Sequence, residues 1–281
     1  MNKFKSKTLP IIIATLIALF VAVIVMFPII WIIPASFKSR NELFMIPNTF
    51  FPREFTLENF QKVFTVKVNG SKYPRAFLMT FVVATISALT SLSVNMLAAY
   101  GFARFKFKGK TIVWCIFLIS MFTPGITIMM TSIRIVNQLR MVDTIFVLFV
   151  PMMANSYNIF FFRQYFLGIP RSLEEAAIID GASRFRIFIN IYLPLSITPI
   201  IINGLGVFIG AWNNFIWPTL TVSDNPNLTQ ISQLIRAMSE RYSGQYGIVI
   251  AATTLSITLP LALFGIFQKR IIDGIAISGN K

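Results

Sequence analysis

The 281-residue chain is 56% hydrophobic and only 12% charged, whereas a soluble globular domain carries about 25% charged residues, so its composition places it in a lipid bilayer. Its net charge of +15 would suggest nucleic-acid binding in a soluble protein, but the basic residues lie mostly between apolar runs and therefore indicate a membrane surface and not nucleic acid. The lack of histidine excludes histidine relays and histidine metal sites, and the single Cys115 excludes an intrachain disulfide and a cysteine metal cluster.

An uncharged apolar run from 8 to 37 follows three lysines, Lys3, Lys5 and Lys7. A secretory signal peptide also begins with basic residues, but its apolar region is shorter and ends at a small-residue cleavage site. We therefore predict a retained helix over 9–33. Because a helix needs roughly 20 apolar residues to cross the hydrocarbon core, five more uncharged stretches are predicted to span: 76–103, 111–133, 144–162, about 195–220 and 242–268.

These stretches predict an all-α integral membrane protein with six transmembrane helices and both termini on one side. The turn at 104–110 contains four basic residues, and short loops rich in Lys and Arg usually face the cytoplasm. This rule gives cytoplasmic tails at 1–8 and 269–281, a first helix at 9–33, extracytoplasmic loops at 34–75 and 221–241, a core at 76–268, and a cytoplasmic loop at 163–194.

A polar segment between the apolar runs, IPRSLEEAAIIDGASRFRIFINIYLP at 169–194, carries local helix signals. Ser172 and Glu175 stand three residues apart, as in a capping box, where each side chain accepts a hydrogen bond from an unpaired backbone donor. Asp180 and Gly181 predict the end of the helix, because glycine readily adopts the left-handed conformation found there. A helix of about two turns is too short to be stable alone in water, so we expect it to dock on another surface.

None of the six predicted spans contains Asp, Glu, Lys or Arg. Ion-coupled carriers usually place ionisable groups within their spans, so the sequence argues against a proton- or ion-driven mechanism. Amide side chains in the spans offer both donors and acceptors, which suits a polyhydroxylated solute, although they could equally form hydrogen bonds between helices. The candidates for a translocation path are Asn155, Asn158, Asn203, Asn213 and Asn214.

Gly109-Lys110-Thr111 looks like the end of a phosphate-binding loop. That motif requires a glycine five positions before its second glycine, and Arg104 stands there instead. We therefore expect no nucleotide site, and no catalytic or metal site, in this chain. Energy for uphill transport would have to come from outside it.

The extended pattern within 169–194 resembles the EAA loop of ABC-importer permeases: Glu175-Ala176-Ala177 is followed, at that spacing, by Gly181 and by the residues of an Ile-x-Leu-Pro end. AAYGFARFKFKGK at 98–110, FFRQYFLGIPRSLEEAAIIDGAS at 161–183 and AWNNFIWPTL at 211–220 look like the smaller permease subunit of the maltose transporter and its carbohydrate-importer relatives. The likeness covers essentially the whole chain and implies the bundle of a type I ABC importer permease in a bacterial cell membrane.

By this resemblance the chain would form a heterodimer with a second permease subunit, seated on a dimer of cytoplasmic ABC ATPases that bind ATP and Mg. An extracytoplasmic sugar-binding protein would deliver the sugar, and the EAA loop would be the coupling helix. The helix signals and the resemblance together give the predicted coupling residues Ser172, Glu175, Ala176, Ala177, Asp180, Gly181, Ile191, Leu193 and Pro194.

Three alternatives stay open at this point. The nearest is an ABC permease for an amino acid, a peptide or phosphate. The second is a facilitator or ion-coupled secondary carrier that works without ATP, against which the uncharged spans argue. The third is an intramembrane enzyme, for which the sequence offers no histidine, no nucleophile turn and no paired acids within the spans.

Overall fold

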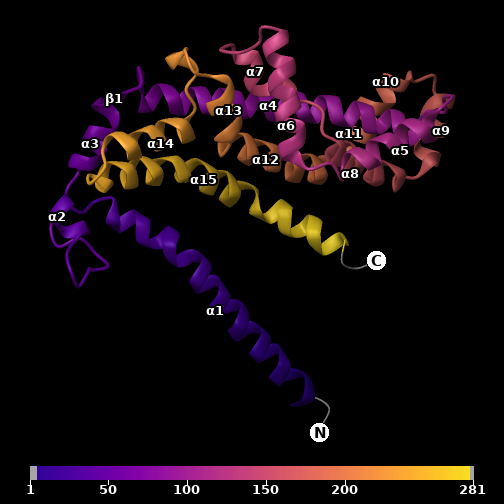
Figure 1. The fold of residues 1–281 in the computed structure, drawn as a ribbon. Coiled ribbons are helices and arrows are strands. Elements are labelled where there is room, and N and C mark those ends of the chain that lie inside the picture. The colour runs from indigo at the N-terminus through magenta and orange to yellow at the C-terminus, as the bar shows by residue number, and fades with distance from the viewer. Residues whose placement is uncertain (1–4, 279–281) are drawn as a thin grey trace. The chain divides into compact units, whose positions relative to one another are not determined.

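The computed structural model describes residues 5–278 and is almost entirely helical (Figure 1). Residues 1–4 of the predicted N-terminal tail and 279–281 of the predicted C-terminal tail lie outside the described residues. The chain divides into two compact units. One comprises Met1–Val68 and Ile235–Thr258, and the other comprises Asn69–Leu234 and Leu259–Lys281.

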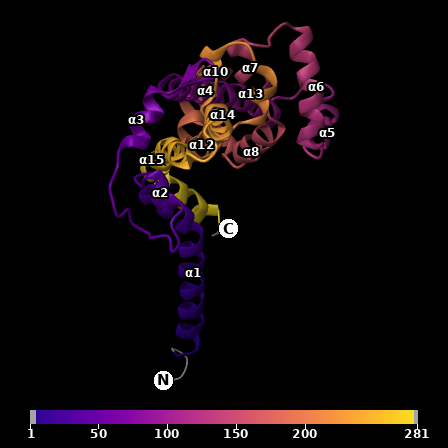
Figure 2. The ribbon, with the colours of Figure 1, turned by 60° about the vertical axis from the view of Figure 1, so that its left-hand side comes forward.

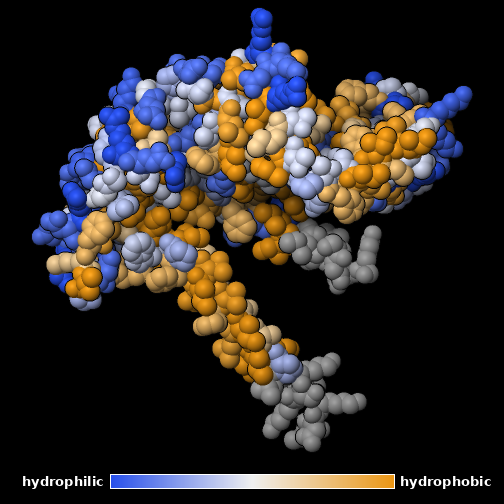
Figure 3. All heavy atoms as spheres, in the orientation of Figure 1, coloured by the Kyte–Doolittle hydropathy of each residue, from blue (hydrophilic) through white to orange (hydrophobic). Residues whose placement is uncertain are grey.

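The first unit begins with the long helix α1 (Lys5–Ala35), and the face of this helix seen in Figure 3 is mainly apolar. The short helices α2 (Arg40–Leu43) and α3 (Glu58–Thr65) follow, and α3 is amphipathic. Asn59 on α3 is buried and donates to the carbonyls of Ser36 and Lys38, each at 2.9 Å. These two bonds fasten α3 to the segment that leaves α1.

The second unit is organised around α4 (Tyr73–Arg104), with α8 (Ser156–Leu167) and α12 (Ile197–Trp212) packed along it (Figure 2).

The remaining elements of the two units are short. They are β1 (Lys67–Val68), β2 (Ser71–Lys72), α5 (Lys110–Ser120), α6 (Gly125–Gln138), α7 (Ile145–Phe149), η1 (Val150–Met152), α9 (Arg171–Ile179), α10 (Arg184–Ile187), η2 (Phe188–Tyr192), α11 (Leu193–Leu195), α13 (Ile216–Thr221) and η3 (Pro226–Leu228). The boundary between the units falls within α14 (Ile231–Arg241) and again within α15 (Tyr246–Ser278).

Residues 5–278 contain up to six candidate membrane spans if each bent pair of helices counts as one. Three helices are continuous: α1, α4 and α15. The other three predicted spans are each broken: α5 meets α6 at 105°, α7 and η1 meet α8 at 47°, and the helix that ends at Leu195 meets α12 at 82°. Hydropathy locates an apolar segment but does not register a bend within it, so the sequence predicted these three as continuous.

Near two of the breaks a proline frees a backbone carbonyl, and a side chain from another helix pairs with it. Proline lacks an N–H group, so Pro151 leaves the Val147 carbonyl without its helical donor, and Pro199 does the same to Leu195. A buried carbonyl needs a partner. The Trp217 indole Nε1 donates to the Val147 carbonyl at 2.8 Å, and the Tyr165 hydroxyl donates to the Leu195 carbonyl at 2.7 Å. Side chains from other helices thus supply the donors that both carbonyls lack.

Candidate functional site

The short helix α9 occupies the middle of the predicted cytoplasmic loop, but the capping box predicted for it is wrong. The helix begins at Arg171, one residue before Ser172, with Pro170 at the N-cap and no side-chain cap bond. Pro170 has φ −57° and ψ 134°. The proline ring fixes a φ that is compatible with the start of a helix, and the helix begins at the next residue. Ser172 therefore lies inside the first turn, and Glu175 is exposed.

The C-terminus of α9 confirms the predicted stop at Gly181. The Gly181 N–H donates to the Ile178 carbonyl at 3.0 Å, and the Ala182 N–H donates to the Ala177 carbonyl at 2.9 Å. This pair of bonds is a Schellman motif, which requires a left-handed residue after the helix. Gly181 supplies it with φ +76°.

Glu174, the neighbour of the predicted Glu175, is the carboxylate that anchors α9. It is 7% exposed. Arg184 Nη1 forms an ion pair with its Oε1, and the Tyr192 hydroxyl donates to its Oε2 at 3.0 Å. Arg104 Nε lies 3.7 Å from the same Oε2. A buried carboxylate requires such pairing and hydrogen bonding to remain charged, so α9 is fixed by partners from two other parts of the chain.

Arg104 is the central residue of this arrangement, and its side chain is only 2% exposed. It stands at the last residue of α4, and its Nη2 donates at 2.5 Å to each of the carbonyls of Phe166 and Ile169. These carbonyls lie at the end of α8, where backbone acceptors lack helical donors and a cation is favoured. One guanidinium therefore joins the ends of α4 and α8 to α9.

An aromatic core lies beneath the ionic cluster. Tyr100, Phe162, Phe166, Phe188 and Tyr192 are buried together, with the Tyr100 and Tyr192 rings 4.8 Å apart. Three predicted coupling residues, Ala177, Ile191 and Leu193, pack half-buried against this core. The others are exposed: Ser172, Glu175, Ala176, Asp180, Gly181 and Pro194.

The outer surface of the same loop is apolar at several positions. Leu173 and Ile178 on α9 are 44% and 43% exposed, Ile179 is 86% exposed, and Phe185 on α10 is 63% exposed. Together with the exposed Glu175 they form what we call the α9 surface. Large apolar side chains gathered at an exposed tip are typical of a protein–protein contact. These apolar residues and Glu174 were not predicted from the sequence. The pattern that could have identified Glu174 is its position three residues before Ala177, which places both residues on one face of the helix.

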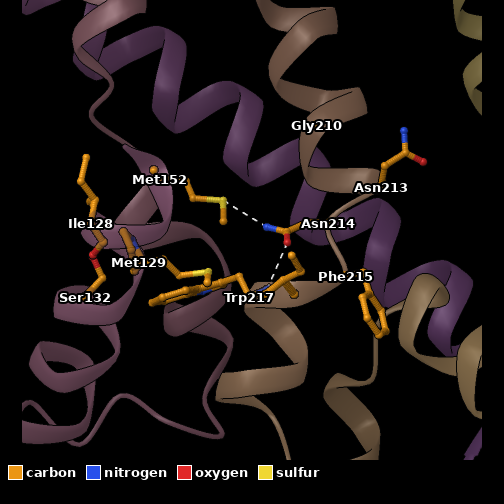
Figure 4. Close-up of a pocket in the computed structure, with 12 residues that line it drawn as sticks. Ile128, Met129, Ser132, Met152, Gly210, Asn213, Asn214, Phe215 and Trp217 are labelled. Carbon is orange, nitrogen blue, oxygen red and sulfur yellow. Dashed lines mark hydrogen bonds between the residues drawn. The ribbon is translucent and has the colours of Figure 1, made fainter. Parts of the chain in front are cut away.

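Two of the predicted path residues line a cavity of about 660 Å³ between α6, η1 and α13. Figure 4 shows Asn214 directed between Met152 and Trp217, whereas Asn213 extends away from them. Asn214 Nδ2 lies 3.7 Å from the Met152 sulfur, and its Oδ1 accepts from the Trp217 N–H at 3.3 Å. Asn214 is therefore engaged with its neighbours, and Asn213 is exposed.

A second cavity, of about 680 Å³, shares Gly125, Pro151 and Met152 with the first and is lined by Asn155 and Asn158. Asn155 caps α8, and its Oδ1 accepts from the Asn158 N–H at 3.2 Å. The fifth candidate, Asn203, lines neither cavity; its Nδ2 donates to Asn158 Oδ1 at 2.9 Å. The structure thus brings four of the five asparagines to two adjoining cavities and gives Asn203 a supporting position.

Asn95, which was not among the candidates, connects α4 to the break before α8. Its Oδ1 accepts from the Asn155 N–H at 2.9 Å, and its Nδ2 donates to the Met153 carbonyl at 3.1 Å. It is fully buried. A buried amide that satisfies both sides of a helix break fixes that break in place. Among the described residues, no group of three or more His, Cys, Asp or Glu side chains could bind a metal ion.

Comparison with known proteins gives consistent matches. The family model described as binding-protein-dependent transport system inner membrane component matches residues 91–274. The arabinooligosaccharides transport system permease protein AraQ of Halalkalibacterium halodurans is 31% identical over 99% of both chains. The sn-glycerol-3-phosphate transport system permease protein UgpE of Escherichia coli is 30% identical over 93% of this chain and 94% of its own.

Solved structures show the same fold. A chain of a bacterial ABC transporter involved in the import of the acidic polysaccharide alginate superposes with a TM-score of 0.82, covering 96% of this chain and 98% of its own at 22% identity. A chain of a bacterial alginate ABC transporter in complex with an alginate pentasaccharide-bound periplasmic protein gives a TM-score of 0.64 at 16% identity, covering 96% of this chain and 99% of its own.

Proposed function

Because this chain belongs to the family of binding-protein-dependent transport system inner membrane components, we propose that it is the permease subunit of an ATP-driven importer of sugars, most simply oligosaccharides. Membership confirms the predicted membrane transport component and the all-α fold of a type I ABC importer permease. The solute, the partner chains and the direction in which the loops face belong to the proposal.

The observation that carries the proposal is the exposed α9 surface, which the buried carboxylate of Glu174 and its two arginine partners hold in place. A helix of nine residues is too short to be stable alone, yet Glu174, Arg104 and Arg184 fix it rigidly while its apolar side chains remain exposed. A rigid helix with an exposed apolar face can transmit the movement of whatever binds it to the helices behind it. In this proposal α9 is the coupling helix, and the predicted coupling residues contact or support the ATPase that binds it.

The partners follow from what this chain lacks. No complete phosphate-binding loop occurs in the sequence, so ATP and Mg would be bound by a dimer of cytoplasmic ATPases. A second permease subunit would complete the translocation path. The periplasmic protein in the complex of similar fold supports an extracytoplasmic binding protein here. The basic turn at 104–110 favours a cytoplasmic position for α9 and for both termini.

Sugar is favoured as the solute by the hydroxyl and amide side chains that line the cavities, and by the arabinooligosaccharide function named for AraQ. The function named for UgpE makes a phosphate ester the second candidate, since that relative is nearly as similar.

The test is uptake into proteoliposomes by the chain assembled with its sister permease, its ATPases and its binding protein. We expect ATP-dependent accumulation of a labelled sugar from a panel that includes arabinotriose and maltotriose. Accumulation of sn-glycerol-3-phosphate and of no sugar would favour the second candidate. Transport by the chain alone, driven by an ion gradient, would contradict the proposal.

A further inference from the structure

The 680 Å³ cavity differs from the rest of the membrane-embedded core because hydroxyl and amide side chains gather in its wall. Its size lies within the range of small-molecule sites, about 300–1,000 Å³. Its wall comes from α4, the end of α5 and the start of α6, η1, the start of α8, and α12. Its main polar lining residues are Ser87, Ser91, Ser120, Asn155, Ser156 and Asn158.

Most of these side chains already have hydrogen-bond partners, so the polar groups without one are the candidates for contact with a ligand. Asn95 Nδ2 donates to Ser91 Oγ at 2.8 Å, and the hydroxyls of Ser120 and Ser156 lie 2.7 Å apart. Ser87 is 1% exposed, and its Oγ has no hydrogen-bond partner among the described residues. Burial of an unpaired hydroxyl is unfavourable, so a partner from outside the chain would remove that cost.

Asn158 offers a second free group in the cavity wall. It is 9% exposed, and its Oδ1 is occupied by Asn203. Its Nδ2 donates to none of the residues that the structure describes. The first turn of α8 also lies in this wall, where backbone N–H groups lack helical acceptors. The cavity therefore presents a hydroxyl from α4 and donors from α8 to the same space.

The charge of the cavity limits what it can bind. None of the described residues that line either cavity is Asp, Glu, Lys or Arg. A phosphate or carboxylate moved into such a space would lose its hydration without gaining a cationic partner. A helix N-terminus supplies only about half a positive charge, which does not replace the Arg or Lys that anion sites use. An uncharged solute with many hydroxyls meets no such penalty.

We propose that this cavity is a binding site for an uncharged, polyhydroxylated segment of the solute, contacted by Ser87 from α4 and Asn158 from α8. The inference rests on the proposed importer function and extends it in two ways. It gives this chain solute contacts of its own, and it selects neutral sugars over phosphate esters.

The experiment uses the assembled transporter in proteoliposomes, with arabinotriose, maltotriose and sn-glycerol-3-phosphate as separate labelled probes. Ser87→Ala removes the free hydroxyl and little else. We expect sugar uptake at saturating binding protein to fall about threefold to tenfold, the effect of one hydrogen bond, while stimulated ATP hydrolysis stays at the wild-type rate. The matched control is Ser93→Ala on the exposed side of α4, which should transport as wild type does.

A second measurement does not depend on the size of that effect. In a Cys115→Ser background, Ala154→Cys places one thiol at an exposed position in the cavity wall. Transported sugar should slow its reaction with a polar methanethiosulfonate reagent. The site would be overturned, with the importer function intact, by three results together. The wild-type transporter would take up sugar, Ser87→Ala would be fully active, and sugar would not protect the thiol at residue 154 from the reagent. Uptake of sn-glycerol-3-phosphate alone would overturn the neutral-solute selectivity, and absence of ATP-dependent uptake of every probe would count against the importer function itself.

Discussion

Glu174 Oε2 lies 3.7 Å from Arg104 Nε, and both side chains are buried although the residues belong to the short helix α9 and to the end of the long helix α4. This ion pair joins α9 to α4, a continuous candidate membrane span. Truncating one member of a buried pair leaves the other charge uncompensated. In the proposed function Glu174 is therefore a positioning residue for coupling, distinct from its exposed neighbour Glu175.

The first prediction concerns this pair. Glu174→Gln removes the charge that Arg104 and Arg184 share, and we expect a loss of about 3 kcal/mol of stability, at the low end for buried pairs because Arg184 is about half exposed. Thermal unfolding of the purified complex measures this loss. Glu175→Gln is the matched control, because its side chain is exposed, and it should change the unfolding temperature little. Equal effects of the two substitutions would contradict the assignment.

A second prediction concerns the end of α9. Gly181 has φ +76°, and a Cβ at this position would meet nothing within 4 Å, so a side chain there is opposed by backbone conformation and not by crowding. Gly181→Ala should cost about 1–2 kcal/mol and lower ATP-driven uptake by displacing the turn between α9 and α10. Gly206→Ala, in a helix with equally open space, should be neutral or slightly stabilising. The turn would not be needed for coupling if both variants transported normally.

The third prediction tests the two proline breaks. Trp217→Phe leaves the Val147 carbonyl without its donor, and Tyr165→Phe does the same to the Leu195 carbonyl. We expect each to destabilise the protein by about 1 kcal/mol. The effect of Trp217→Phe should be larger, because Trp217 is 5% exposed and Tyr165 is 39% exposed. Unfolding curves of the two variants in one detergent decide this, and the reverse order would show that the bonds do not stabilise the breaks.

A fourth prediction separates docking from folding. Ile179 is 86% exposed on the α9 surface, so Ile179→Asp should leave stability unchanged while reducing co-purification of the ATPases at least tenfold. Ile46→Asp is the control, because Ile46 is 96% exposed in the first loop and lies on the opposite side of the membrane in the proposed topology. Undiminished co-purification with Ile179→Asp would show that the ATPases bind elsewhere.

The sequence predicted the helical class, the apolar segments and the loop that contains α9, because hydropathy and short motifs are local properties. The pairing of the Val147 and Leu195 carbonyls escaped prediction, since their donors, Trp217 and Tyr165, lie far away in the chain. The prolines alone marked where a carbonyl would be freed, but not which side chain would pair with it.

Glu174 and Ser172 illustrate the same limit at the site. Two adjacent glutamates have equal local propensity, and the partners Arg104, Arg184 and Tyr192, supplied by other segments, distinguish Glu174 as the buried one. Ser172 had the spacing of a cap, but Pro170 started the helix one residue earlier and placed Ser172 inside it. The hydrogen bonds between Asn95 and Asn155 and between Asn203 and Asn158 could not be predicted either, because the two partners belong to different parts of the chain.

The central claim is that α9, fixed by Glu174, transmits ATPase movement to the membrane helices. Its most direct test is the amount of solute taken up per ATP hydrolysed by the reconstituted transporter containing Glu174→Gln, with Glu175→Gln alongside. We predict that the ATPases still hydrolyse ATP with Glu174→Gln while solute uptake per ATP falls at least tenfold. Wild-type uptake per ATP in that variant would contradict the account.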